Sequence, residues 1–343
     1  YKIDPTTMPM QLKRDELGKF KLQLTPWVER QVGDNVTNPK PSLISRGVDL
    51  SGDGQLSVRR IQNMTFWRNR VVFLSGTNVI CSQPGSNNLI NPNLWAETAL
   101  TVSPNDAIDL STSSDSPAEL YEALELGQGL LLFSENQQWL LGAEAEILTP
   151  DTAKLTPQAT YNFNIKTQPV SMGTTVGFLD NAGQRSKFFE ATRIQKGYEP
   201  DILNQSISVA DLLPKNIDLI TNSRENTFVL FGIKGTDTIY GYRYFNSGEK
   251  RIQSAWFKWK LDDTIRYFAI LDDVLYIVHT KGNLVRIPLV DKWANWVNDF
   301  PVHLDNWSEL AADRFTYHKD TNKTTFSIGD YGFDADRSIY VIN

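Results

Sequence analysis

The sequence has very little cysteine and histidine. Cys81 is its one cysteine, and His279, His303 and His318 are its three histidines. One cysteine rules out an internal disulfide framework, and the apolar run around Cys81 predicts a buried thiol. None of the histidines lies in a catalytic motif, and the sequence has no Gly-x-Ser-x-Gly elbow. Nucleophilic catalysis therefore has little support, and His279 is interpreted as a packed strand residue.

Long apolar runs and an excess of positive charge are also missing. No run approaches the roughly 18 apolar residues of a membrane-spanning helix, and no signal peptide is visible, so no stable membrane insertion is predicted. The formal net charge of −6 and the pI of about 5.3 argue against tight nucleic-acid binding, which needs clustered Lys and Arg. Because the chain begins at Tyr1 instead of Met, we expect it to be a piece of a longer protein.

Helical periodicity is scarce as well. Only residues 119–126 and 292–298 resemble short helices. Aromatic residues make up 11% of the sequence, a composition that suits strands and interfaces better than a helical bundle. The sequence therefore predicts a strand-rich protein.

A hairpin pattern comes back along the chain. Residues 69–82 read as an apolar run, a polar turn with Gly76 and Asn78, and a second apolar run, which is typical of a tight β-hairpin. Further copies pair residues 130–133 with 138–141, 176–179 with 188–189, 227–231 with 238–242, 274–278 with 284–287, and 323–328 with 338–342.

The spacing of these hairpins indicates a repeat fold. Their equivalent positions, from Phe73 to Ile328, lie 45 to 60 residues apart. One hairpin core in each interval of this size is typical of propeller blades, which bury their faces by stacking on their neighbours. We expect an all-β fold, an irregular β-propeller of about six blades over residues 46–343. Residues 1–45, which are rich in proline, are expected to form an extended N-terminal arm with strands such as 19–24. A pair of β-sandwiches with coincidental spacing is the alternative.

Residues 49–57 resemble a calcium loop of the EF-hand type. Asp49, Ser51, Asp53, Gly54 and Ser57 occupy the expected positions. The twelfth position, which needs a bidentate glutamate, is Arg60, and no helical periodicity flanks the loop. A Gly/Asp turn between two strands is the preferred interpretation, and no metal or other cofactor is predicted.

Two aspartate pairs resemble the two carboxylates of a glycosidase. Asp262-Asp263 and Asp272-Asp273 each lie next to a predicted strand, where aspartate is a common turn residue. Neither pair is therefore assigned a catalytic role.

Residues 247–259 interleave basic and aromatic side chains, which are able to stack on single-stranded bases. The alternation within this segment is explained more simply by a strand with both faces partly covered.

Several stretches together resemble the tail tubular protein B family, the tail nozzle of short-tailed bacteriophages. They run in family order over most of residues 1–290, and the resemblance is less clear in the final fifty residues. The stretches are residues 4–9, 27–34 and 38–42; 68–79 with Ser82; 105–109, 130–134, 137–139 and 148–150; and 247–259 continuing to Leu275-Tyr276.

The resemblance implies a structural role and no catalytic residue. Nozzle proteins form a six-fold ring at the distal end of the short tail, dock on an adaptor ring (tail tubular protein A), contact tail fibres and line the channel for genome ejection. It therefore implies a virion tail component, assembled in the host cytoplasm, with DNA passing through the channel without sequence-specific binding. Family members are longer and have further domains. Two other hypotheses remain open: a carbohydrate-binding or glycan-degrading propeller acting at the host surface, and a DNA-binding propeller.

Overall fold

The computed structural model describes residues 9–28, 46–47, 57–58, 61–85, 93–96, 100–113, 118–143, 147–193, 200–247, 250–289 and 315–326. The chain falls into two compact units, Tyr1–Val290 and Asp291–Asn343. The expected boundary between an arm and a propeller at residue 45 stays a prediction.

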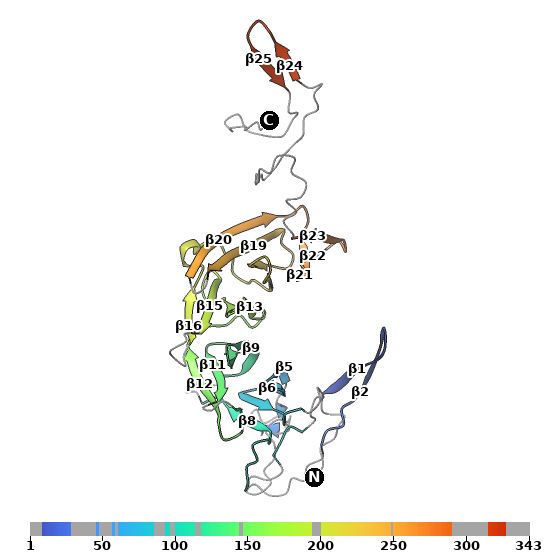
Figure 1. Ribbon diagram of the computed structural model, residues 1–343, viewed down its shortest axis with the longest axis vertical. Helices are drawn as coiled ribbons and strands as arrows, with labels where there is room; N and C mark the ends of the chain where they lie inside the picture. The colour runs from blue at the N-terminus through green and yellow to red at the C-terminus, as the bar shows by residue number, and fades with distance from the viewer. Residues whose placement is uncertain are drawn as a thin grey trace. The chain divides into compact units, whose positions relative to one another are not determined.

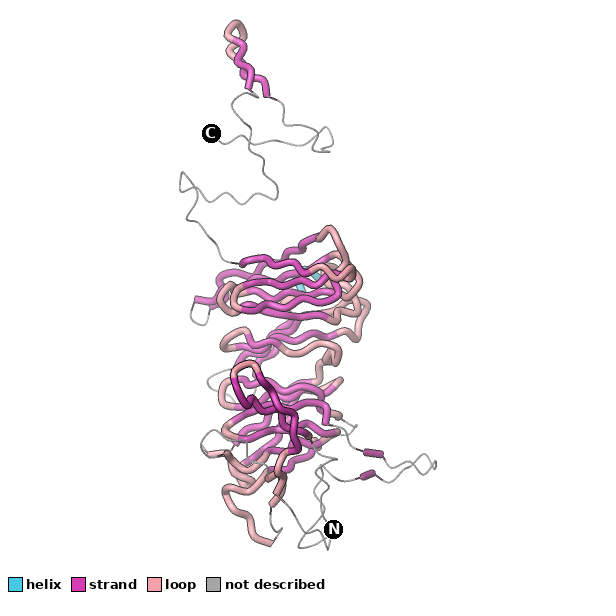
Figure 2. The backbone as a smooth tube through the Cα atoms, turned by 90° about the vertical axis from the view of Figure 1, so that its right-hand side faces the viewer, coloured by secondary structure: helices cyan, strands magenta, loops and turns pink. Residues whose placement is uncertain are grey.

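Almost all regular structure in the described part of the chain is β-strand (Figures 1 and 2). The one helical element there is the short 3-10 helix η3 (Ile207–Val209). Five antiparallel sheets follow one another along the chain, and within each sheet the strands pair in sequence order. They are the first sheet, β5 (Ile61–Trp67), β6 (Arg70–Ser75), β7 (Asn78–Cys81) and β8 (Ile108–Ser111); the second, β9 (Leu120–Leu126), β10 (Gly129–Ser134), β11 (Gln138–Ala143) and β12 (Ala153–Ala159); the third, β13 (Val170–Ser171), β14 (Thr175–Asp180), β15 (Lys187–Arg193) and β16 (Pro200–Asn204); the fourth, β17 (Leu219–Ser223), β18 (Phe228–Gly232), β19 (Thr238–Ser247) and β20 (Lys250–Lys260); and the fifth, β21 (Ile265–Leu271), β22 (Val274–His279) and β23 (Leu284–Pro288).

Three shorter hairpins complete the described strands. Near the N-terminus β1 (Met10–Glu16) pairs with β2 (Lys19–Leu24), so the expected strand at residues 19–24 is confirmed. The two-residue strands β3 (Arg46–Gly47) and β4 (Ser57–Val58) also pair. In the second unit β24 (Phe315–His318) pairs with β25 (Lys323–Phe326).

The five sheets stack in chain order as the blades of a propeller do. The first strands of consecutive sheets, from β5 through β9, β13 and β17 to β21, contact one another, and Figure 1 shows the sheets in this succession. Each of four apolar clusters takes its buried residues mainly from two consecutive sheets, so every sheet covers its neighbour. Examples are Leu74 with Leu132, Phe133 with Phe178, Phe188 with Phe231, and Leu230 with Phe268.

This stacking confirms the expected all-β propeller and explains why it forms. A buried Phe or Leu side chain contributes about 1.5–3 kcal/mol, and a single sheet has no second layer against which to bury both faces. The first five predicted hairpins are present as β6–β7, β10–β11, β14–β15, β18–β19 and β22–β23. The sixth, which pairs residues 323–328 with 338–342, lies largely outside the described residues, so the number six stays a prediction.

The expected helix at residues 119–126 is wrong. This segment is strand β9, which pairs with β10 along its length. Leu, Glu and Ala favour helix locally, but tertiary contacts override that preference. As a strand, β9 buries Leu120 against the first sheet and Leu126 against the third. The other expected helix, residues 292–298, lies outside the described residues.

Candidate functional site

Buried polar groups join neighbouring sheets, and one such group lies between the third and fourth sheets. Arg251 of β20 donates from Nη2 to both carboxylate oxygens of Glu190 of β15, at 2.6 and 2.8 Å. Glu190 is only 1% exposed, and Thr175 donates a further hydrogen bond to its Oε1 atom at 2.7 Å. The same guanidinium donates to the phenol oxygen of Tyr242 and to Oδ1 of Asn246. The buried carboxylate therefore has a charged partner and a full set of donors.

The tyrosines of this network stay protonated near neutral pH. Burial, followed by the nearby Glu190 charge, raises the pKa of Tyr244 to about 12. Burial also raises the pKa of Tyr242, although Ser254 and Arg251 oppose that shift. The Arg251 guanidinium lies 5.4 Å from the centre of the Tyr244 ring, which adds a cation–π contact. The network is suited to holding two sheets together and not to transferring protons.

A buried arginine organises the first sheet in a comparable way. The guanidinium of Arg70 donates to four main-chain carbonyl oxygens, at 2.7 Å to Ser82, 2.8 Å to Asp106, 3.3 Å to Leu148 and 3.4 Å to Pro104. Leu148 lies in the segment between the last two strands of the second sheet, so one side chain links two sheets. Burial lowers the pKa of Arg70.

Cys81 lies fully buried in the first sheet, as the sequence predicts. Burial is the main cause that raises the pKa of its thiol to about 12. The reactive thiolate is therefore scarce at neutral pH.

The junction between the first and second sheets contains a carboxyl group with a different environment. Asn63 of β5 donates a short hydrogen bond to Glu122 of β9. Burial raises the pKa of Glu122 to about 7, and the Asn63 amide only partly opposes that shift. This carboxyl group therefore titrates near neutral pH.

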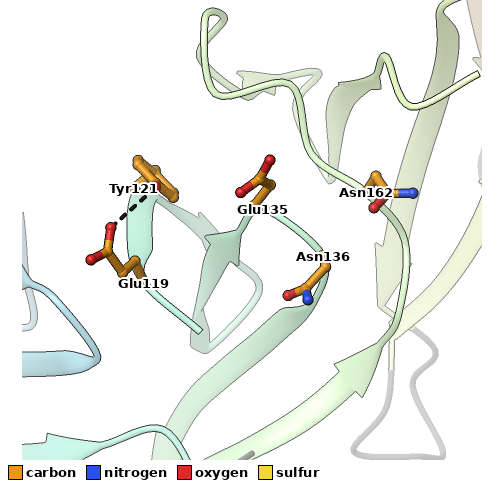
Figure 3. Close-up of a pocket in the computed structure, with 5 residues that line it drawn as sticks. All are labelled: Glu119, Tyr121, Glu135, Asn136 and Asn162. Carbon is orange, nitrogen blue, oxygen red and sulfur yellow. Dashed lines mark hydrogen bonds between the residues drawn. The ribbon is translucent and has the colours of Figure 1, made fainter. Parts of the chain in front are cut away.

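A polar hollow of about 440 Å³ opens beside the second sheet (Figure 3). Glu119 and Tyr121 come from the start of β9, Glu135 and Asn136 from the turn between β10 and β11, and Asn162 from the connection to the third sheet. The Tyr121 hydroxyl donates to Glu119 at 3.1 Å, and burial followed by this hydrogen bond raises the pKa of Tyr121. Its carboxylates and amides are able to hydrogen-bond a polar molecule, but the arrangement contains no paired nucleophile and base.

One of the two aspartate pairs considered from the sequence forms a turn. Asp272 and Asp273 have φ angles of 48° and 58° and form the two-residue turn between β21 and β22. Asp273 Oδ1 also accepts a hydrogen bond from Asn226 at 3.0 Å. The pKa of Asp263 is lowered, first by the main-chain N–H of Thr264 and then by the Lys281 ammonium, whose Nζ lies 3.1 Å from Asp263.

The basic and aromatic segment is a strand, as preferred from the sequence. Residues 250–260 form β20, in which Arg251 pairs with Glu190. Trp256 packs with Phe188 and Phe231 between the third and fourth sheets. Arg251 and Trp256 already contact other side chains of the fold, so this part of the segment has no free surface on which nucleic-acid bases could stack.

The histidines and the calcium-like loop lead to no site in the described part of the chain. His279 is buried, and its Nδ1 lies 3.2 Å from the Thr264 carbonyl oxygen. His318 is exposed in β24, whereas His303 and residues 49–56 lie outside the described residues. The described residues contain no group of three His, Cys, Asp or Glu side chains that is able to hold a metal ion. They also include no helix that is long and apolar enough to span a membrane.

The sequence interpretation missed the polar groups inside the stack. Glu190 and Arg70 stand next to residues that become core, Phe189 and Val71. A charged residue inside a buried strand is rarely left unpaired, so the sequence at these two positions indicates that each has a buried partner. The identity of their partners is not visible locally, because Arg251 lies 61 residues from Glu190.

Together these features define a class of protein: an all-β propeller in which buried polar groups such as Arg251–Glu190 and Arg70 join neighbouring sheets. The chain matches the bacteriophage nozzle protein family over residues 1–342, and it belongs to that family. The resemblance seen in the sequence is thereby confirmed.

The tail tubular protein gp12 of Escherichia phage T7 is a similar protein, 23% identical over 333 residues. The alignment covers 94% of this chain but 39% of that protein, so the chain spans well under half the length of this relative. Among solved structures, Hsv2p of Kluyveromyces lactis has a TM-score of 0.42 at 10% identity, over 79% of this chain and 85% of that one. The Pan2 WD40 domain of Neurospora crassa has a TM-score of 0.39 at 8% identity, over 68% and 65% of the two chains.

Proposed function

We propose that the chain is a subunit of a six-fold ring that forms the tail nozzle, docks on the adaptor ring and the tail fibres, and encloses the channel for genome ejection. The observation that carries the proposal is membership of the nozzle protein family over residues 1–342. Tail tubular protein gp12 is named for a tail structure.

The physical properties of the chain support a passive channel component with no enzyme activity. The formal net charge is −6, and an acidic wall repels the phosphates of passing DNA instead of binding them. The buried Arg251–Glu190 pair and the stacked aromatic clusters connect consecutive sheets, which suits a part that must keep its shape.

The proposal is tested by imaging the assembled protein. Electron microscopy of the intact, full-length protein that contains this chain, alone and mixed with the adaptor ring, is expected to show six copies around a central pore. Native mass spectrometry of the same samples then gives the copy number. A strictly monomeric particle in both samples overturns the ring.

The channel is tested separately by DNA binding. Double-stranded DNA retention is expected to be weak and to fall no further when salt is raised from about 50 to 200 mM, because few phosphates are neutralised. Strong salt-dependent retention contradicts the acidic channel and favours a DNA-binding propeller.

The glycan hypothesis receives no support from the aspartates on which it depends. Asp272 and Asp273 form a turn, and Asp263 accepts a hydrogen bond from Thr264. Binding or turnover in a host-polysaccharide screen that is lost in Asp262→Asn, Asp263→Asn, Asp272→Asn or Asp273→Asn restores that alternative.

A further inference from the structure

The hairpin Met10–Leu24, hereafter the amphipathic hairpin, has two chemically different faces. The register places Met10 opposite Leu24, Leu12 opposite Leu22 and Arg14 opposite Phe20, so one face carries five apolar side chains together with the Arg14 guanidinium. The other face contains Gln11 opposite Gln23 and Lys13 opposite Lys21.

The apolar face of the amphipathic hairpin is exposed. Leu12 and Phe20 are each 64% exposed, and Leu22 is 61% exposed. A two-stranded hairpin is marginally stable in water by itself, and exposed apolar residues on one face mark a contact surface. Arg14 is the charged side chain on this face, whereas Lys13 and Lys21 lie on the opposite one. The amphipathic hairpin is therefore suited to a partner that has an apolar surface with carboxylates beside it.

The amphipathic hairpin is rooted at the first-sheet end of the stack. Trp27, three residues beyond β2, packs against Phe73 with a ring separation of 6.3 Å. Phe73 belongs to a cluster with Val71, Ile80 and Trp95 on the face of the first sheet that points away from the second sheet. The hairpin thus leaves the stack at one end.

The other end of the stack has an apolar surface of its own. We call it the outer face of the fifth sheet; it consists of Tyr267, Ala269, Leu271, Val274, Tyr276, Val278, Leu284, Arg286 and Pro288. Tyr267 is 54% exposed, Leu271 63% and Leu284 64%. The opposite face of the fifth sheet packs on the fourth sheet through Phe268, Leu275 and Ile277.

These two surfaces match each other in kind. Both are β-sheet faces with alternating apolar side chains, and two such faces pack about 10 Å apart. Exposed Asp262 and Asp272 flank the outer face of the fifth sheet, and Arg14 lies on the apolar face of the hairpin, so the charges beside the two surfaces are opposite. Both surfaces belong to the unit Tyr1–Val290. Val274 is buried and Ala269, Tyr276 and Val278 are half-buried, but Tyr267, Leu271 and Leu284 are exposed, as are Leu12, Phe20 and Leu22 of the hairpin, so the two surfaces do not cover each other within one copy.

We propose that the amphipathic hairpin of one copy docks on the outer face of the fifth sheet of the next copy. Because the two surfaces differ and lie at opposite ends of the stack, the contact is heterologous, the type that repeats from copy to copy and closes into rings. This inference rests on the proposed ring and identifies the residues that join its subunits.

Cross-linking between variants that each carry one added cysteine tests the contact. Leu22→Cys chains are mixed with Leu284→Cys chains, assembled and oxidised, and the linked peptides are identified by mass spectrometry. The buried Cys81 is shielded and stays in place. We expect disulfides between positions 22 and 284, and at least tenfold fewer when Gln23→Cys, on the opposite face of the same strand, replaces Leu22→Cys.

The outcomes separate this inference from the proposed function. Rings that form without 22–284 links, or with 22–22 links predominating, overturn the inference and leave the nozzle ring intact. Cross-links from position 22 to the adaptor protein, in place of a second copy of this chain, overturn the inference as well. Absence of any assembly overturns the ring and the inference together.

Charge substitutions give a second measurement. Leu12→Asp combined with Leu22→Asp is expected to weaken self-association by about 100-fold or more, because two apolar contacts are lost. Gln11→Asp combined with Gln23→Asp adds the same charge to the other face and is expected to change the association several-fold at most. Equal effects of the two pairs contradict docking through the apolar face.

Discussion

The junction between the third and fourth sheets and the junction between the first and second sheets each contain a carboxylate, fully buried in the first case and half-buried in the second, and each gives it different hydrogen-bond donors. Glu190 meets the Arg251 guanidinium and the Thr175 hydroxyl. Glu122 meets the Asn63 amide, and its pKa rises to about 7. Burial without a cationic partner favours the protonated form of Glu122. Glu122 therefore makes the junction between the first and second sheets sensitive to pH near neutrality.

Removing the Arg251 guanidinium from the junction between the third and fourth sheets gives the largest expected effect. Arg251→Ala leaves the Glu190 carboxylate buried without its ion-pair partner, which costs about 3–5 kcal/mol. Urea denaturation at pH 7 measures the loss. The double variant Arg251→Met, Glu190→Gln removes both charges and is expected to lose much less. A loss below about 1 kcal/mol in Arg251→Ala shows that the pair is dispensable.

Overpacking the same junction tests its close fit. In Gly177→Ala the new Cβ meets the Phe188 ring at 2.5 Å and Met172 Sδ at 3.0 Å, so the expected cost is about 1–3 kcal/mol. Gly142→Ala is the control, because no atom lies within 4 Å of its new Cβ. Thermal unfolding compares the two variants, and similar melting temperatures contradict the close packing around Phe188.

The junction between the first and second sheets is expected to lose stability as pH rises. Folding raises the pKa of Glu122 from 4.5 to about 7, so its destabilising contribution is absent below pH 4.5 and develops between pH 4.5 and 7. Glu122→Gln keeps a hydrogen-bonding group and removes the charge. Because this half-buried site is partly screened by solvent, we expect a gain of about 1 kcal/mol at pH 8.

The pH dependence of the Glu122→Gln effect provides its control. No gain is expected at pH 4, where the native carboxyl group is already protonated. Urea denaturation at both pH values measures the difference, and an equal gain at pH 4 and pH 8 contradicts the assignment to titration of Glu122.

Removing an exposed ion pair is expected to give the smallest change in stability among these variants. Lys260 Nζ lies 4.0 Å from Asp237 Oδ2, and the lysine side chain is 80% exposed. Lys260→Gln is expected to change stability by less than about 0.5 kcal/mol. Chemical denaturation side by side with Arg251→Ala contrasts an exposed ion pair with a buried one, and a loss above about 1 kcal/mol refutes that contrast.

The sequence predicted the hairpins well because their signals are local. The apolar runs on both sides of Gly76 mark β6 and β7, and the turn residues Asp272 and Asp273 mark the start of β22. The strand β9 was missed because Leu120–Leu126 favours helix on propensity. Only its pairing with β10 and its contacts with neighbouring sheets show otherwise.

By itself the sequence determined that this protein is built of repeated hairpins, that Cys81 is buried and that the chain resembles the nozzle family. Alternating side chains and turn residues act between near neighbours, so these features can be read in order along the chain. The tertiary structure decided which sheets meet and how their buried charges are satisfied. Arg251 reaches Glu190 across 61 residues, and Asn63 reaches Glu122 across 59, because stacking sheets brings distant strands face to face.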